Sequence, residues 1–399
     1  MNKLALASLA IVLVFCLVLV GSPISASTPA PTTQRLNVGV VFEMTGPAAP
    51  GVVPMVRGVT ECANWINNKG GIDVKGEKYK INLIIVDSKG TPDGGINAAN
   101  RLVFKDKVKY IVGEVFPFMC EAVRSISDPN KVLYFTSQYD LPNPAYPYTL
   151  SATYPYIATK PVLYDYLVKA YPNVKKVAMS HQDEAGNTRA ALAAEKEISK
   201  HGLQLTINEV YPFATSDHLA LATKMVGTNP DAVDFNMEFT EGGADFVKCL
   251  RQTGFKGPIL QSTGPDVNAV IPMVGNPAYA TDWILPTFDP AKVRAGSVLP
   301  DFLKLWGNAY HVPFMNDAIR GWNPLYCLVQ SIQKAQSLDP TDVVKAFTSM
   351  RTIDTVEGTA KVGGLKTFGF NGTVLEPCPL TRVMNGKPEF VGWYKTLDY

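Results

Sequence analysis

The sequence lacks an excess of charge of either sign. Its 399 residues include 37 lysines and arginines against 35 aspartates and glutamates, which gives a formal net charge of +2. A protein that binds nucleic acid needs a strong positive field at its surface, so nucleic acid is not an expected partner. Charged residues make up only 18% of the chain, and hydrophobic residues make up 46%. Because a single core rarely serves more than about 250–300 residues, we expect two domains.

The short motifs of common catalytic sites are also missing. The sequence contains no G-x-S-x-G, H-E-x-x-H or G-x-x-x-x-G-K-[ST] pattern, and no G-x-G-x-x-G follows a strand-like run. The four histidines are dispersed, and only His181 directly follows a strand-like run, where a loop position is favoured over a ligand contact. We therefore expect no enzyme, no cofactor and no metal site.

Cysteine pairs of the kind that build a disulfide framework or a zinc site are absent. The six cysteines are widely spaced and form no C-x-x-C pair. Cys62, Cys249 and Cys327 lie among apolar residues at helical spacing, which favours small core side chains. One disulfide among the five cysteines after Cys16 stays open, because spacing cannot pair them.

Long hydrophobic runs are absent except at the N-terminus. Lys3 is the only charge before the apolar run at 4–20, and helix-breaking and small residues follow up to Ser27. This order is typical of an export signal, and a retained anchor helix is the alternative that the length of the run leaves open. We expect a signal peptide at 1–26, a linker at 27–35, and a protein that works in the periplasm or on the outer face of the cell membrane.

Beyond the linker, short apolar runs alternate with amphipathic segments. Strand-like runs lie at 36–42, 79–86, 110–112, 132–135, 177–179, 205–210, 232–235 and 258–260. The helical segments between them predict parallel strands with right-handed crossovers, hence an α/β fold with helices on both faces of each sheet. A break near 150–156 separates two such units, and ligands bind at the carboxyl ends of the strands in open sheets of this kind. Three further helices are expected at 299–311, 318–336 and 340–349, before short strands and turns.

Several short segments in a fixed order carry a family resemblance. They are VGV at 38–40, MTGP at 44–47, INNKGGI at 66–72, IIVD at 84–87, AANRLV at 98–103, YIVG at 110–113, VLYFT at 132–136 and LRQTG at 250–254. Together they resemble the type I periplasmic solute-binding proteins of ABC transporters, the leucine/isoleucine/valine-binding protein family. Each segment alone is a weak signal, but their order and spacing cover nearly the whole chain after the linker.

The resemblance implies two Rossmann-like lobes with parallel sheets, joined by a hinge of three segments. The N-terminal lobe is expected at 36–152 and 287–366, and the C-terminal lobe at 153–286 and 367–399. Such a pair closes on a small solute and delivers it to the permease subunits of an ABC importer, which needs no covalent chemistry. The membrane is then contacted only through the N-terminal segment or the permease.

The resemblance also implies where the ligand binds. The expected ligand-binding residues are Thr45, Glu114, Phe116, Phe118, Gln138, Tyr139, Asp140, Phe239 and Asp266. Phe116 and Phe118 stand in a loop where relatives offer hydroxyl groups to a carboxylate, although both also suit core packing. Asp266 stands where relatives carry the acid that binds an ammonium group.

The apolar side chains of Phe116 and Phe118, together with the acid Asp266, predict a small amphipathic ligand, such as a branched-chain or aromatic amino acid. Two alternatives remain open: a receptor for an aromatic or other apolar carboxylate, and a sensor that presents the solute to a signalling partner.

Overall fold

The structure, a computed structural model, describes residues 34–46, 48–138, 142–153, 156–213, 215–238 and 240–396. The expected signal peptide and the linker up to residue 33 lie outside this range, whereas Gln34 and Arg35 already belong to the first strand. Within the described part of the chain, no helix is both long and apolar enough to cross a membrane.

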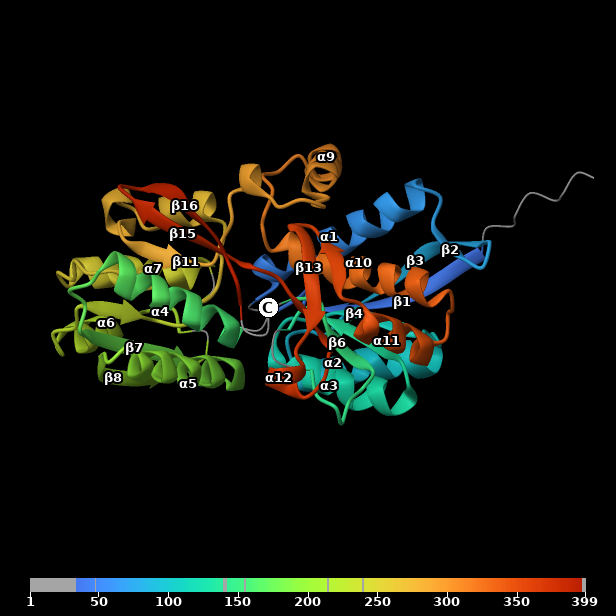
Figure 1. Ribbon diagram of the computed structural model, residues 1–399, viewed down its shortest axis with the longest axis horizontal. Coiled ribbons are helices and arrows are strands. Elements are labelled where there is room, and N and C mark those ends of the chain that lie inside the picture. The colour runs from blue at the N-terminus through green and yellow to red at the C-terminus, as the bar shows by residue number, and fades with distance from the viewer. Residues whose placement is uncertain are drawn as a thin grey trace, which may run out of the picture. The chain divides into compact units, whose positions relative to one another are not determined.

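Nine of the described strands form the first sheet, in the order β12-β13-β14-β6-β5-β4-β1-β3-β2 (Figure 1). Their bounds are β1 Gln34–Phe42, β2 Ile72–Val74, β3 Glu77–Asp87, β4 Tyr110–Gly113, β5 Leu133–Thr136, β6 Thr149–Ser151, β12 Thr352–Thr355, β13 Gly358–Gly363 and β14 Thr373–Leu375. The central strands β3, β1, β4, β5 and β6 pair in parallel. The parallel pairing predicted from the alternating pattern is therefore confirmed.

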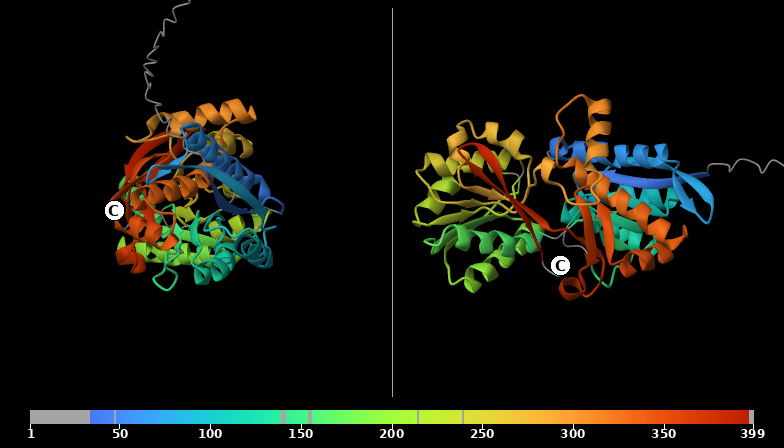
Figure 2. Two further views of the ribbon diagram at one scale, coloured as in Figure 1. Left: turned by 90° about the vertical axis from the view of Figure 1, so that its right-hand side faces the viewer. Right: turned by 45° about the horizontal axis from the view of Figure 1, so that its top comes forward.

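Seven of the described strands form the second sheet, in the order β16-β15-β11-β10-β9-β7-β8. They are β7 Lys176–Gln182, β8 Gln204–Tyr211, β9 Ala232–Asp234, β10 Ile259–Leu260, β11 Trp283–Leu285, β15 Cys378–Met384 and β16 Lys387–Tyr394. Strands β8, β7, β9, β10 and β11 are parallel, and β15 and β16 add an antiparallel edge. Figure 2 shows this red pair beside the yellow strands of the sheet. The elements around the first and second sheets are called the first and second lobe below.

Helices cover both faces of the first sheet. They are α1 Ala49–Asn68, α2 Pro92–Asn100, α3 Pro117–Ser127, α9 Leu299–Tyr310, α10 Ala318–Ala335, α11 Pro340–Ser349 and α12 Leu365–Phe368. Side chains alternate along β1, so Val38 and Val40 enter one core with α1 and α10, and Val41 enters the other with α2 and α3. Helix α1 buries Met55, Val59, Cys62, Ala63 and Ile66 at helical spacing on the face that meets the sheet.

The second sheet is covered in the same way. Its helices are α4 Thr159–Ala170, α5 Ala185–Lys200, α6 Leu219–Val226, α7 Thr240–Gln252 and α8 Val267–Met273. Along β7, Val177 and Met179 enter a core with α4 and α5, whereas Ala178 enters a core with α6, α7 and α8.

Short helical turns occur in both lobes. They are η1 Arg101–Lys105, η2 Asp128–Asn130, η3 Tyr156–Ala158, η4 Pro277–Ala280 and η5 Pro290–Lys292.

The structure corrects one boundary of the expected lobes. The second lobe was expected to resume at residue 367, but β14 pairs with β13 and β6 in the first sheet. The chain joins the second sheet only at β15. Periodicity could not show this, because a three-residue strand carries no pattern that identifies its partner.

The cysteines occupy the core. Cys62, Cys120, Cys249, Cys327 and Cys378 are free and buried. The single disulfide that the sequence left open is therefore not formed among the described cysteines, and the small-core-residue interpretation is confirmed for them.

Candidate functional site

A cavity of about 600 Å³ lies where loops of both lobes meet. The first lobe contributes the start of α1, the loop after β4 and the segment entering α10. The second lobe contributes the loops after β7, β8, β9 and β10. Most of these loops follow the carboxyl ends of parallel strands, where the sequence predicted a ligand to bind. The described lining residues are Ala48, Pro50, Gly51, Val52, Met55, Val115, Phe116, Pro117, Gln182, Glu184, Asn187, Phe213, Thr215, Ser216, Met237, Glu238, Glu241, Gly242, Asp245, Thr263, Gly264, Pro265, Ala269, Met273, Met315, Asp317 and Arg320.

One part of the cavity wall is apolar. Phe116 and Phe213 line it, and Phe118 packs directly behind them. The rings of Phe116 and Phe118 stack with centroids 6.1 Å apart, and Phe213 meets both edge-on at 6.2 and 6.3 Å. Four methionines extend the apolar surface, at positions 55, 237, 273 and 315. Methionine adapts to irregular apolar shapes, so this wall suits a bulky apolar group.

The polar part of the wall is strongly acidic. Five carboxylates line the cavity, those of Glu184, Glu238, Glu241, Asp245 and Asp317, against the guanidinium of Arg320 among the described residues. An oxygen of Asp317 lies 3.7 Å from Arg320, so these two charges pair. Burial raises the pKa of Asp317 against the opposing effect of Arg320, and the negative charges of Asp266 and Glu241 raise it further.

A buried hydrogen-bond network holds two of these acids in place. Gln182 Nε2 donates to Glu238 at 2.9 Å, and the Tyr211 hydroxyl donates to the same carboxylate. His218 has no exposed side-chain surface and lies between Glu238, with Nε2 3.4 Å away, and Asp245, with Nδ1 3.0 Å away. Burial lowers the pKa of His218, but the two carboxylates outweigh it and raise the pKa above its ordinary value. The two carboxylates of the network therefore favour the protonated imidazole of His218.

The glycine at position 242 explains how the acidic network can pack so tightly. A Cβ atom there would lie 2.4 Å from Glu238 Oε2. Only glycine therefore lets the first turn of α7 pass this close to the Glu238 carboxylate.

The start of α5 also faces the cavity. Glu184 Oε2 accepts hydrogen bonds from the backbone N–H groups of Gly186 and Asn187, at 2.8 and 3.1 Å, and so caps the helix. Its other oxygen, Oε1, is buried and has no hydrogen-bond partner in the described part of the chain. Asn187 is only 4% exposed, and its side-chain oxygen also has no partner there. Two acceptors at the cavity thus lack a donor among the described residues.

The structure brings few of the expected ligand-binding residues to this cavity. Phe116 lines it, and Phe118 supports Phe116 from behind without being a lining residue. Tyr139, Asp140 and Phe239 lie outside the described residues.

Four other expected residues do not line this cavity. Thr45 is exposed and donates its hydroxyl to Asp87 at 2.5 Å. Gln138 is fully buried, and its backbone N–H donates to the Thr136 hydroxyl. Asp266 Oδ1 accepts from the backbone N–H of Asn268 at 2.9 Å and so caps α8, although its neighbour Pro265 lines the cavity.

Glu114, the fourth of these residues, is fully buried behind the cavity wall. Burial raises its pKa to about 8, and the charges of Glu43 and Asp87 act in the same direction. Its backbone adopts a left-handed φ of 48°, and its N–H donates to Val41 O at 2.9 Å. Glu114 therefore shapes the loop after β4 rather than contacting a ligand.

Sequence reasoning missed most of the acidic wall. Glu238 and Asp245 flank the start of α7, and Glu184 precedes α5. For Glu184 and Glu238, position in the sequence could have indicated the ligand site, because both follow the carboxyl end of a parallel strand. The sequence around His218 gave no such indication, because the contacts of His218 are with two acids from later segments of the chain.

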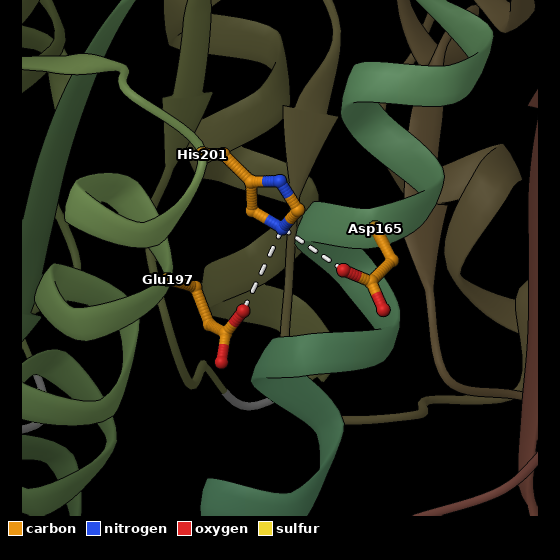
Figure 3. A group of neighbouring side chains, drawn as sticks. All are labelled: Asp165, Glu197 and His201. Carbon is orange, nitrogen blue, oxygen red and sulfur yellow. Dashed lines mark ion pairs between the residues drawn. The ribbon is translucent and has the colours of Figure 1, made fainter.

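A second cluster of ionisable groups lies between α4 and α5 (Figure 3). His201 Nε2 lies 2.9 Å from Asp165 and 3.6 Å from Glu197, and these three side chains could in principle hold a metal ion. However, Lys200 Nζ already contacts Glu197 at 2.7 Å and Asp165 at 3.4 Å. Since a cation of the chain neutralises both acids, we assign this cluster to ion pairing between the two helices.

Comparison with known proteins identifies the class. A family model described as periplasmic binding protein matches residues 35–387. The chain therefore belongs to the periplasmic binding protein family, and the resemblance to its type I, leucine/isoleucine/valine-binding branch is confirmed.

Particular relatives agree with this assignment. The Leu/Ile/Val-binding protein homolog 3 of Brucella melitensis is 27% identical over 357 residues, which cover 84% of this chain and 90% of the relative. The substrate-binding protein LivJ of Streptococcus pneumoniae, solved in complex with isoleucine, superposes with a TM-score of 0.76 at 16% identity, over 91% of this chain and 99% of its own. A solute-binding protein of R. palustris, solved in complex with benzoate, gives a TM-score of 0.74 at 16% identity, over 91% and 97% of the two chains. At such identities these two structures show a shared fold.

Proposed function

We propose that this protein is the extracytoplasmic solute-binding receptor of an ABC importer, and that it closes on a small amphipathic ligand such as a branched-chain or aromatic amino acid. The observation that carries the proposal is the cavity of about 600 Å³, which has an apolar wall on one side and an acidic wall on the other. A volume of this size accommodates a small organic solute, and the two walls suit its apolar and polar ends.

Binding without catalysis accounts for this site. Relatives are named as binding proteins, and residues from two lobes line the cavity. Closure around a solute requires only that the solute binds the closed arrangement more tightly than the open one. The partners proposed for the loaded receptor are the permease subunits of the importer. The proposed location is the periplasm or the outer face of the cell membrane.

The alternative of an apolar carboxylate has less support from the lining. One neighbour in structure was solved with benzoate, but five carboxylates line the cavity of this protein. An anionic ligand would meet like charges there, which disfavours it. The sensor alternative uses the same cavity and differs only in the partner that recognises the loaded receptor.

Isothermal titration of the protein purified from its host tests the proposed function. We expect saturable binding of leucine, isoleucine or phenylalanine, and native mass spectrometry without refolding should reveal any ligand that remains bound. Tight saturable binding of a hydrophilic sugar, with no response to any apolar solute, would contradict the proposal.

A further inference from the structure

Several backbone donors that could bind a ligand carboxylate are already engaged by acids of the described residues. The N-terminus of α5 is a natural anion site, but the Glu184 carboxylate accepts from its first N–H groups. At the N-terminus of α1, Glu43 accepts from the backbone N–H of Ala48 at 2.9 Å. Helix α3 begins with Pro117, which has no N–H to donate.

Several side-chain donors of the described lining are engaged as well. Arg320 is paired with Asp317. Of the three hydroxyl groups in the described lining, two donate to carbonyl oxygens of the chain: Thr215 to Pro212 at 2.7 Å and Thr263 to Glu238 at 2.9 Å. An entering carboxylate would therefore find few free donors among the described lining residues, and an unpaired buried charge is strongly unfavourable.

For a positively charged ligand group, in contrast, the cavity offers hydrogen-bond acceptors that are free of donors among the described residues. Glu184 Oε1 and the Asn187 side-chain oxygen are buried acceptors without partners in the described part of the chain. Asn187 is more than nine-tenths buried, so water does not readily replace the missing donor. An ammonium group carries several N–H donors and a charge that the acidic wall attracts.

From this arrangement we propose that the ligand is a cationic amine with a bulky apolar or aromatic body, and that a carboxylate on the ligand is not required for binding. The ammonium lies at Glu184 and Asn187, and the apolar body lies against Phe116, Phe213 and the methionines. This inference rests on the proposed function, because it assigns the ligand of that same cavity. It narrows the ligand from amino acids to amines.

A matched set of ligands tests the inference by isothermal titration. 2-Phenylethylamine is phenylalanine without its carboxylate, and 3-phenylpropanoate is phenylalanine without its ammonium. 3-Methylbutylamine and 4-methylpentanoate bear the same relation to leucine. We expect each amine to bind about tenfold or more tightly than its parent amino acid, because the unpaired carboxylate costs the parent about 1–3 kcal/mol. Neither acid should bind measurably.

The outcomes separate the inference from the function on which it rests. Tighter binding of leucine or phenylalanine than of the corresponding amines would overturn the inference and leave the receptor function intact. Binding of 3-phenylpropanoate in preference to 2-phenylethylamine would do the same. If no amine, amino acid or acid of the set binds at millimolar concentration, the proposed function fails, and the inference fails with it.

A pair of variants tests the position of the ammonium. Glu184→Gln keeps an oxygen that can cap α5 but removes the charge, so we expect the affinity for 2-phenylethylamine to fall about tenfold or more. Asp183→Asn removes the same charge from the neighbouring exposed residue, which does not line the cavity, and should change the affinity less than about twofold. Equal effects of the two substitutions would refute the assigned contact.

Discussion

Several ionisable side chains of this protein are buried, and they are stabilised in different ways. Lys160 and Asp234 are both fully buried, with Nζ 2.8 and 3.0 Å from the two carboxylate oxygens. The Tyr164 hydroxyl and the Asn236 backbone N–H also donate to Asp234, so its negative charge is well satisfied. Glu114, in contrast, is fully buried, and burial raises its pKa to about 8 although hydrogen bonds with Ser88 and the Val115 backbone act in the opposite direction.

The buried ion pair gives the first prediction. Lys160→Met should lower the free energy of unfolding by about 3–5 kcal/mol, because it leaves the Asp234 carboxylate buried without its cation. The control is Lys78→Met, which breaks the half-exposed pair between Lys78 and Asp73 and should change stability by less than about 1 kcal/mol. Urea unfolding of both variants measures the difference. Equal losses would mean that the buried pair contributes no more than an exposed one.

The neutral carboxyl of Glu114 gives a prediction about pH. Its pKa is about 8 in the folded protein and close to 4.5 when unfolded. Between these values the folded state binds the extra proton, so this group makes stability fall as pH rises, by roughly 1.4 kcal/mol per pH unit. Glu114→Gln should remove that contribution and gain stability relative to the wild type from pH 5 to pH 8.

Thermal unfolding across this pH range checks the Glu114 prediction. The control is Glu121→Gln, at an exposed acid of α3, which should leave the pH dependence unchanged. Parallel pH profiles for wild type and Glu114→Gln would show that Glu114 is not neutral in the folded protein.

At the scale of elements, α1 and α10 cross at unusually close range. A Cβ atom on Gly58 of α1 would lie 1.9 Å from Ala318 O, and one on Gly321 of α10 would lie 1.7 Å from Met55 O. The two glycines thus allow each backbone to rest on the other. The crossing positions the cavity, because Met55 and Arg320 line it from these two helices.

The close crossing predicts a strong effect of one methyl group. Gly321→Ala should lower the free energy of unfolding by about 3 kcal/mol, because the obstacle is backbone and both helices must shift. Gly307→Ala in α9 is the matched control, since its Cβ would meet nothing within 4 Å. There we expect a gain of up to about 1 kcal/mol from helix propensity. A neutral Gly321→Ala variant would show that the helices separate easily.

At the scale of the whole molecule, the two lobes approach each other where α3 and α5 begin. A Cβ atom on Gly186 would lie 3.1 Å from Pro117 Cγ, a contact between the second lobe and the first. Phe213 of the second lobe also meets Phe116 and Phe118 of the first. These contacts border the cavity, so the proposed closure on a ligand depends on them.

The approach of the lobes gives a prediction about affinity. Gly186→Ala should weaken ligand binding about tenfold, because a Cβ atom there would lie 3.1 Å from Pro117 Cγ across the lobe contact and 2.9 Å from Glu184 Oε2 at the cavity. The double variant Gly186→Ala with Pro117→Ala should lose less affinity than the sum of the losses in the two single variants, since Pro117→Ala removes the ring that opposes the added methyl group. Titration with the best ligand of the matched set measures all four proteins. Strict additivity would exclude a contact between these residues during closure.

The sequence predicted the fold well for a physical reason. The apolar run of β1 reflects burial on both faces of the sheet, and the helical spacing of Met55, Val59 and Ile66 reflects burial of one helix face. Both patterns are local properties of their elements. Very short elements such as β14 carry too few residues for such a pattern. Their place in a sheet depends on partners far along the chain, and so the lobe boundary was misplaced.

The site was predicted less well, again for a physical reason. By itself, the sequence determined two α/β lobes, the family, and a ligand site at the carboxyl ends of the strands, because burial patterns and loop positions are local properties. The tertiary structure decided which polar groups face the cavity and which are engaged elsewhere. Asp266 caps its own helix α8, whereas Thr45 binds Asp87, and Glu238 is held by Tyr211 and His218, all of which belong to other segments. Hydrogen-bond partners that are distant in sequence made that choice.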